Sequence, residues 1–347
     1  MVETIGGAGI AYEWTRRALS ASKHVVTSNK ELVACRGPEL MRLAAEHGAH
    51  YRYEASVGGG IPIIRPLHHD LAANRIERIA GIVNGTTNFI LSAMASGAGS
   101  FETVLAEAQR RGYAEQDPSA DMDGIDACRK LAILSSIVTG HAVSPDDIHT
   151  EGIRALKAAD AEAAARRQYR IKLLAVMQRD ASDRLSLLVA PHLVPADHPL
   201  AQVNDVYNAV QVTGDSVGDV MFYGQGAGTW PTASAVVSDL IELAGGSGLA
   251  AGSAVWAPAE ADLVRPHHAV PVHAVVRVPF ESAGDFAGRI PTAEGPFAEV
   301  PGVAVWYEVG ANGGLTEGGL AGLMRSFASE HCQILRFWEA GHPRRPF

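Results

Sequence analysis

Short apolar runs alternate with amphipathic segments over residues 1–56. The pattern predicts strands at 2–5, 24–27 and 51–54, and helices at 11–20 and 39–47. Strands that alternate with helices in this way are typical of a parallel, doubly wound sheet. We therefore expect an α/β fold that begins with such a sheet.

The apolar runs become longer between residues 57 and 225. The pattern predicts strands at 75–83, 169–178, 185–193 and 209–223, and helices at 87–95, 101–110 and 125–138. A further helix is predicted at 231–244, ahead of a Gly-rich break. This part of the chain is expected to form a second, α+β domain, with residues 226–250 returning to the first one.

A proline-containing linker precedes a third region at residues 272–347. Strands are predicted there at 273–279, 303–309 and 333–338, with a helix at 320–329. This mixture indicates a small α+β domain at the C-terminal end of the chain.

Composition and charge argue against several classes of protein. The net charge is −9, with 29 Lys and Arg against 38 Asp and Glu, and no basic stripe favours a nucleic-acid partner. Three widely spaced cysteines without a CxxC argue against a disulfide scaffold or a zinc site and favour a reducing compartment. No apolar run reaches the roughly 18–20 residues that span a bilayer, and no signal peptide is evident. We expect a soluble, cytoplasmic protein.

The most informative segment runs from Gly112 to Lys130. Asp126 and Lys130 are four residues apart on a predicted helix and so share one face, at the mouth of an apolar core. One interpretation is an ordinary salt bridge beside a solvated acidic loop. The other is a site for a zwitterionic substrate, in which Glu115 and Asp126 hold an ammonium group while Lys130 passes a proton to a developing alkoxide.

A second lysine, Lys30, follows the buried strand that ends in Thr27. Ligands of open α/β sheets bind beyond the carboxyl ends of the strands, so this lysine is placed to meet one. Helix capping by Ser28 or Asn29, with a surface lysine next to it, is the alternative.

Two glycine-rich loops also suggest binding. Glu54 and the three glycines at 58–60 combine a carboxylate with accessible carbonyls, which suits a monovalent cation, although composition alone favours a plain domain crossover. The glycines at 224–228 lie between a strand and a helix, where free N–H groups favour an anion, but GxGxG is weak evidence. Asn84 and Gly85 indicate a turn, and Thr86 or Thr87 is expected to cap the helix that follows.

Taken together, these segments resemble homoserine dehydrogenase between residues 2 and 245. The motifs that carry the resemblance occur in the same order: KHVVTSNK, EASVGGGIPII, GIVNGTTNFIL, GYAEQDPSADMDGIDACRKLAIL and FYGQGAGTWPTASAVVSD. The resemblance implies interconversion of L-aspartate 4-semialdehyde and L-homoserine with NADP or NAD, on the route to threonine, isoleucine and methionine. It also implies a homodimer or higher homo-oligomer held through a sheet.

The resemblance assigns a role to each candidate residue. Lys130 would be the general acid and base, and Lys30 would reach the nicotinamide end of the cofactor and the substrate. Glu115 and Asp126 would hold the amino group of the substrate. The cofactor path would be lined by Gly60, Gly112 and Gly226, and a monovalent cation (Na⁺ or K⁺) would be held by Glu54 with the carbonyls of Val57, Gly59 and Ile61.

Two departures from the family pattern shape the expected domains. The family begins with a strand, a glycine-rich turn and a helix, so roughly 60–80 residues are expected to be missing before Met1, with poor dinucleotide affinity and an exposed sheet edge. The first domain (1–56, with 226–250) is then a partial Rossmann-like nucleotide domain. Residues 57–225 form the substrate-binding, catalytic and dimerisation domain, and 272–347 a divergent ACT-like domain.

Two alternatives to this enzyme stay open. One is a non-catalytic subunit for amino-acid binding or assembly that is derived from it. The other is a different semialdehyde or hydroxy-acid dehydrogenase, which the combination of an acidic pair and a lysine fits less well, because that combination suits an α-amino acid.

Overall fold

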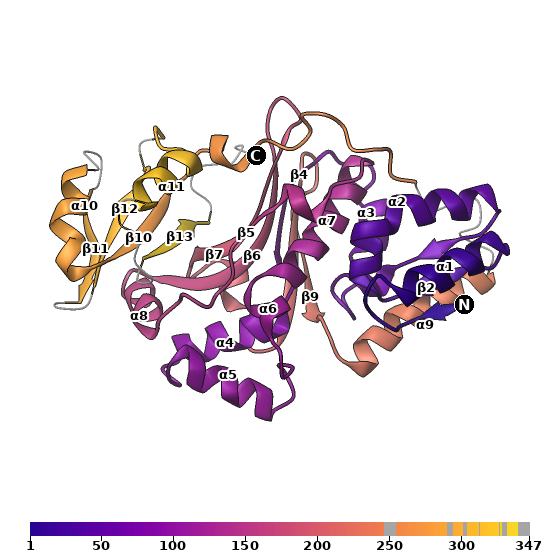
Figure 1. Ribbon diagram of the computed structural model, residues 1–347, viewed down its shortest axis with the longest axis horizontal. Coiled ribbons are helices and arrows are strands. Elements are labelled where there is room, and N and C mark those ends of the chain that lie inside the picture. The colour runs from indigo at the N-terminus through magenta and orange to yellow at the C-terminus, as the bar shows by residue number, and fades with distance from the viewer. Residues whose placement is uncertain are drawn as a thin grey trace.

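A computed structural model describes residues 1–245, 255–289, 294–300, 304–311, 313–325, 327 and 332–338. Its strands form two sheets (Figure 1). The first contains three parallel strands, β1 (Val2–Glu3), β2 (Val25–Thr27) and β3 (Tyr51–Arg52), with β2 in the middle. Two helices connect them, α1 (Ile10–Ser20) and α2 (Lys30–Glu46).

Helix α2 is longer than the sequence pattern suggested, because it begins at Lys30 and not at residue 39. The Asn29 side chain caps it by accepting the N–H of Leu32, and Pro38 lies inside the helix without ending it. The prediction that α2 begins only after the proline was therefore wrong. As a consequence Lys30 stands at the first turn of a helix, directly beyond the carboxyl end of β2.

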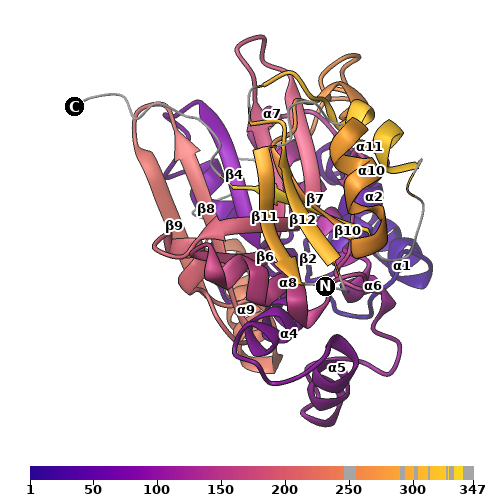
Figure 2. The same ribbon diagram turned by 90° about the vertical axis from the view of Figure 1, so that its left-hand side faces the viewer.

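The second sheet has the strand order β11-β12-β10-β13-β7-β6-β4-β8-β9, and β5 (His149–Thr150) pairs with β7. Its central strands are β4 (Ile76–Ile82), β6 (Tyr169–Arg179), β7 (Leu185–Pro195), β8 (Tyr207–Gly214) and β9 (Gly218–Gln225). The single strand predicted at 209–223 is in fact a tight antiparallel hairpin of β8 and β9. Gly218 lies in the left-handed region (φ 72°), which the turn requires. Figure 2 shows this hairpin at one edge of the sheet.

Helices cover one face of the central strands. They are α4 (Gly85–Ala95), α7 (Ile125–Thr139) and α8 (Ala158–Arg166), which all contact β6, with α5 (Phe101–Arg110) packed on α4. The short helices α3 (Ile64–His68) and α6 (Ser119–Met122) contact α7. Helix α9 (Thr229–Gly245) returns to the first sheet and packs on β2 and on the 3₁₀ turn Glu54–Ser56.

The C-terminal part follows a βαββαβ order. Its elements are β10 (Ala274–Pro279), α10 (Ala283–Arg289), β11 (Glu294–Val300), β12 (Ala304–Val309), α11 (Glu317–Arg325) and β13 (Gln333–Phe337). The sequence pattern did not reveal α10 and β11. Strand β13 pairs in parallel with β7, so this part continues the large sheet. The domain boundaries and the ACT-like assignment stay predictions.

A buried ionic cluster joins the C-terminal part to the central sheet. The guanidinium of Arg336 on β13 donates to both carboxylate oxygens of Glu151 at 2.7 and 2.8 Å, and to Glu317 at the start of α11 at 2.7 and 3.0 Å. His149 contacts Glu151 (2.8 Å) and His267 lies 3.5 Å from Glu317. The two imidazole rings stack 3.7 Å apart. We call these five residues the docking cluster.

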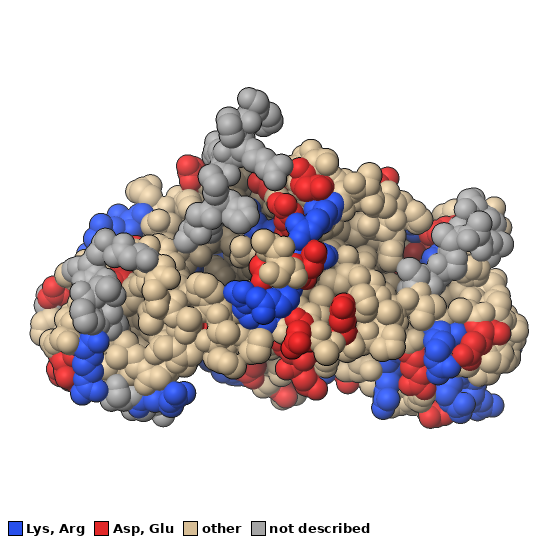
Figure 3. Space-filling model, turned by 90° about the horizontal axis from the view of Figure 1, so that it is seen from above, with Lys and Arg blue, Asp and Glu red and all other residues tan. Residues whose placement is uncertain are grey.

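On the face shown in Figure 3, the Lys and Arg side chains are interspersed with Asp and Glu. Among the residues that the structure describes, no helix is long and apolar enough to cross a membrane.

Candidate active site

The candidate site is built around the first turns of α7. Gly124 precedes the helix in the left-handed region (φ 80°), and a side chain there would lie against Thr150, so glycine is required where the chain enters α7. Asp126 and Lys130 follow one turn apart, with only 2% and 7% of their surfaces exposed. The Lys130 ammonium donates to Asp126 Oδ2 (2.7 Å) and to the Val83 carbonyl at the end of β4 (2.6 Å).

The second predicted lysine reaches the same carboxylate from another element. Lys30 Nζ, from the start of α2, lies 2.6 Å from Asp126 Oδ1. The Lys30 side chain is 41% exposed, whereas that of Asp126 is buried. Asp126 therefore links the carboxyl end of β2 in the first sheet to the helices that cover the second. It pairs with two cations, the buried Lys130 and the solvent-exposed Lys30.

Two further residues complete this group, and sequence reasoning gave neither a role in it. Asn84, which caps α4, donates from Nδ2 to Asp126 Oδ2 (2.9 Å) and to Asp121 Oδ1 (2.7 Å). Asp121 belongs to α6 and is half-buried. We call Lys30, Asn84, Asp121, Asp126 and Lys130 the proton-transfer cluster. The turn at Asn84 was visible in the sequence, but its partners depend on tertiary packing.

The electrostatics of the cluster separate its two lysines. Burial lowers the pKa of Lys130, and the charge of Asp126 opposes that shift without cancelling it. Burial also disfavours the charge on Lys30, but the ion pair with Asp126 outweighs it and raises the pKa of Lys30. Both lysines in turn hold the pKa of Asp126 well below its usual range, against the effect of its burial. Lys130 is thus the cation that loses its proton more readily.

The carboxylates of the site differ in the same way. Burial raises the pKa of Asp121, and repulsion from Asp126 adds to that rise. Glu115, the other predicted partner of an ammonium group, is exposed on the loop between α5 and α6. Gln109 donates to its backbone carbonyl (3.2 Å), and within the described residues its carboxylate has no contact with the proton-transfer cluster. The structure therefore brings Asp121 to Asp126 and leaves Glu115 in solvent.

The predicted cofactor glycines have different surroundings. A side chain at Gly226 would overlap Asn208, and one at Gly60 would press on Pro231, so both are glycines because the chain packs closely there. At Gly112, which ends the turn after α5 in the left-handed region (φ 74°), a side chain would meet open space.

A third glycine-rich loop, which was not singled out from the sequence, follows β1. Gly6 and Gly7 are left-handed (φ 83° and 69°), and side chains there would meet nothing within 4 Å. Asn29, the cap of α2, donates to the Gly7 carbonyl (2.7 Å). This open loop therefore lies beside Lys30, at the carboxyl edge of the first sheet.

The predicted cation site is only partly available. The Glu54 carboxylate accepts the N–H groups of Ile63, Ile64 and Arg65 at 2.8 to 3.0 Å, so its oxygens cap the start of α3. The carbonyls of Val57, Gly59 and Ile61 accept no hydrogen bond from any described residue. Backbone oxygens thus fit a monovalent cation better than the Glu54 side chain does. Within the same residues, no group of three or more His, Cys, Asp or Glu could hold a metal ion.

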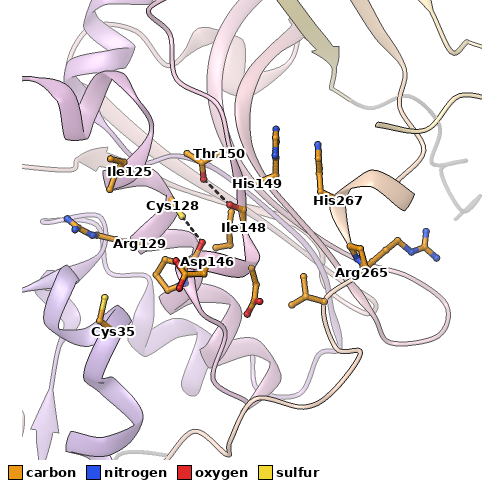
Figure 4. A pocket seen from close by; sticks show the side chains of 14 residues that line it. Cys35, Ile125, Cys128, Arg129, Asp146, Ile148, His149, Thr150, Arg265 and His267 are labelled. Atoms are coloured by element: carbon orange, nitrogen blue, oxygen red, sulfur yellow. Dashed lines mark hydrogen bonds between the residues drawn. The ribbon is translucent and has the colours of Figure 1, made fainter. Parts of the chain in front are cut away.

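A large cavity lies on the other side of α7 (Figure 4). Its volume is about 860 Å³, and Ile125, Cys128 and Arg129 of α7 line it together with Cys35 and His149. Neither Asp126 nor Lys130 reaches it. The proton-transfer cluster therefore occupies the opposite face of the helix, and the chemistry is not assigned to this cavity.

Comparisons with known proteins agree on one family. The family model for homoserine dehydrogenase matches residues 62–241. The homoserine dehydrogenase of Synechocystis sp. is 52% identical over 248 residues, and that of Pseudomonas aeruginosa 49% over 243. These matches cover 71% and 70% of this chain, which spans 57% and 56% of the two relatives.

Solved structures give the same result, in one case over almost the whole chain. The homoserine dehydrogenase of Thiobacillus denitrificans is similar with a TM-score of 0.86 and 36% identity, over 98% of this chain and 82% of that one. A hyperthermophilic archaeal homoserine dehydrogenase mutant in complex with NADPH is similar with a TM-score of 0.61 and 34% identity, over 70% of each chain.

Proposed function

The chain belongs to the homoserine dehydrogenase family, and on this premise we propose that it interconverts L-aspartate 4-semialdehyde and L-homoserine with NADP or NAD. The reaction lies on the route to threonine, isoleucine and methionine. The observation that carries the proposal is the buried Lys130, whose ammonium is aligned by Asp126 and the Val83 carbonyl. Its lowered pKa suits a group that gives and takes a proton.

The cofactor, when bound, supplies the hydride. The chain's own residues then transfer the proton and stabilise the charge that develops on the substrate. Lys130 donates its proton to the oxygen that becomes negative during reduction, and takes it back during oxidation. Asp126 orients Lys130, and Lys30 stays charged at the open side of the site. Low dielectric around Lys130 strengthens these interactions.

The amino group of the substrate requires acceptors. Glu115 and Asp126 are the proposed partners, and Asp121 joins them because Asn84 holds it next to Asp126. Asp121 and Asp126 face two lysines, which leaves the group close to neutral before the substrate binds. Glu115, on its exposed loop, would approach from the solvent side.

The cofactor is proposed to lie along Lys30, Gly60, Gly112 and Gly226. The open backbone at Gly6 and Gly7 supports this path, since ligands of such sheets bind at the carboxyl ends of the strands. The NADPH complex of the archaeal relative supports the choice of a nicotinamide cofactor. The carbonyls of Val57, Gly59 and Ile61, next to Glu54, are proposed to hold Na⁺ or K⁺.

Assembly and location complete the proposal. We place the homodimer interface on the second sheet, where β9 is an edge strand and Met221 and Tyr223 are 39% and 54% exposed. All three cysteines are free thiols, which supports a reducing, cytoplasmic compartment.

The test is reduction of aspartate semialdehyde by NADPH and by NADH, with wild type and Lys130→Ala. Loss of a general acid and base lowers turnover by about 10²–10⁴-fold, with a much smaller change in KM. Lys23→Ala, at an exposed lysine, is the control and should match wild type. Turnover of Lys130→Ala close to that of wild type would reject Lys130 as the proton-transfer group.

Calorimetric titration with homoserine separates the alternatives. If wild type binds homoserine but turns nothing over, the chain is a binding or assembly subunit. If it neither binds homoserine nor reduces the aldehyde, both interpretations fail.

A further inference from the structure

The Asn84 side chain has a fixed orientation. It stands between β4 and α4, where its Oδ1 accepts the N–H of Thr87 at 2.9 Å. An amide that accepts through its oxygen must turn its NH₂ group the other way. Both N–H bonds of Asn84 are then used on carboxylates, one on Asp121 (2.7 Å) and one on Asp126 (2.9 Å).

This arrangement stabilises two neighbouring carboxylates. Asp121 and Asp126 share the amide of Asn84, so their negative charges repel each other, and this repulsion adds to the rise that burial causes in the pKa of Asp121. A neutral donor between them stabilises the two carboxylates at short separation without adding charge. A lysine in its place would add a third cation beside Lys30 and Lys130.

The backbone next to Asn84 takes part as well. The carbonyl of Val83 accepts from Lys130 Nζ, and the oxygen of Asp126 that binds Asn84 also binds Lys130. Two consecutive residues at the end of β4 therefore hold both the lysine and its carboxylate. Only 7% of the surface of Asn84 is exposed, so water cannot replace the hydrogen bonds that its side chain makes to the two carboxylates.

We propose that Asn84 is a positioning residue, which fixes the carboxylates of Asp121 and Asp126 so that Lys130 is held in line for proton transfer. The proposal rests on the proposed function for its catalytic consequence, but not for its geometry. It goes beyond helix capping, which Asn84 also provides through its hydrogen bond to Thr87, and which the sequence had assigned to Thr86 or Thr87.

Two substitutions separate positioning from capping. Ser and Asp cap helices about as well as Asn, so Asn84→Ser and Asn84→Asp both keep the acceptor for Thr87. Both lose the two N–H donors, and only Asn84→Asp adds a negative charge next to Asp121, Asp126 and Lys130. Ser100→Asp at the exposed cap of α5 is the matched control outside the cluster.

If Asn84 positions the pair, turnover falls at least tenfold in Asn84→Ser and further in Asn84→Asp. The pH–rate limb assigned to Lys130 moves upward by about one unit or more in Asn84→Asp, because an added negative charge favours the charged lysine. The charged groups that face Lys130 are Asp126 on α7, Asp121 on α6 and Lys30 on α2. Ser100→Asp should leave both the rate and the limb unchanged.

A second measurement does not depend on turnover. The ¹³Cε resonance of Lys130 is titrated by NMR in wild type, Asn84→Ser and Ser100→Asp, and is assigned by its loss in Lys130→Met. A Lys130 pKa that changes in Asn84→Ser, which adds no charge and keeps the cap, but not in Ser100→Asp supports the proposal even if wild type proves inactive, in which case the proposed function fails alone. Equal titrations and equal rates in all three proteins would show that Asn84 is only a cap and overturn the inference.

Discussion

The proton-transfer cluster and the docking cluster are both groups of charges built around a buried residue, Asp126 in the first and Arg336 in the second, yet they use opposite chemistry. The first surrounds Asp126 with two lysines and an amide. The second surrounds Arg336 with two glutamates, each of which also meets a histidine. Lysine carries a proton that it can release, whereas arginine stays protonated in proteins and presents a rigid fork to carboxylates.

The titration behaviour follows this difference. In the docking cluster the pKa values of Glu151 and Glu317 are lowered to about 2, and that of Arg336 is raised. Burial opposes the charge of all three, but their mutual pairing outweighs it. In the proton-transfer cluster, the pKa of Lys130 falls and that of Asp121 rises, both toward neutral pH. One cluster holds its charges fixed, and the other keeps a proton exchangeable.

The largest expected effect comes from placing the arginine chemistry at the lysine site. Lys130→Arg keeps the positive charge beside Asp126 but cannot release a proton, so turnover should fall by about 10²–10⁴-fold. Steady-state kinetics measure it, with Lys23→Arg at an exposed position as the control. A rate within tenfold of wild type would mean that only the positive charge matters at this position. The distinction between an exchangeable proton in one cluster and fixed charges in the other would then be rejected.

The next effect tests the docking cluster. Arg336→Met leaves the buried Glu317 and the partly buried Glu151 without their cation, which should lower the free energy of unfolding by about 3–5 kcal/mol. Urea unfolding followed by the fluorescence of Trp306 and Trp338, which lie in the C-terminal part, reports the change.

Two variants interpret that measurement. Replacing both glutamates by glutamine in the Arg336→Met background should recover much of the loss, because no unpaired charge then remains. Arg42→Met breaks an exposed pair with Glu46 and should change the free energy of unfolding by about 0.5 kcal/mol or less. A cost for Arg336→Met no larger than for Arg42→Met would show that the docking cluster does not hold the C-terminal part.

The sequence predicted the part of the site that depends on local spacing. Asp126 and Lys130 share a helix face because they are four residues apart, and Lys30 reaches the site because it follows a buried parallel strand. The large sheet was also predicted in outline. The turn at 215–217 was missed although Gly214, Asp215, Ser216 and Gly218 are residues that favour a chain reversal, because the apolar runs on either side resemble one continuous strand.

The rest depended on contacts between distant segments. Asn84 meets Asp121 and Asp126 across 37 and 42 residues, and no periodicity encodes that distance. The sequence also did not show that Asn208 of the adjacent strand packs closely against Gly226. The docking cluster joins Glu151 to Arg336 across 185 residues, and no motif around either residue in the sequence indicated this pairing.

The smallest effect comes from a third buried cation, which has no carboxylate partner among the described residues. Lys172 on β6 donates to Asn88 Oδ1 and to the carbonyl of Val203. Burial, with a smaller contribution from Arg170, lowers its pKa to about 8. At Lys172 no carboxylate of the described residues opposes the effect of burial on the pKa, whereas at Lys130 Asp126 opposes it in part.

The sign of its pH dependence follows. Between about pH 8 and pH 10.4 the unfolded chain binds the proton of Lys172 more strongly than the folded chain does, so this residue makes the free energy of unfolding rise with pH. The rise is at most about 3 kcal/mol. Lys172→Met should remove this pH dependence, so the free energy of unfolding of the variant should exceed that of wild type at pH 7.5, and most of the difference should disappear by pH 10. Lys23→Met should follow wild type at both pH values, and parallel curves for Lys172→Met would show that the Lys172 ammonium is stabilised by neutral oxygens as well as by water.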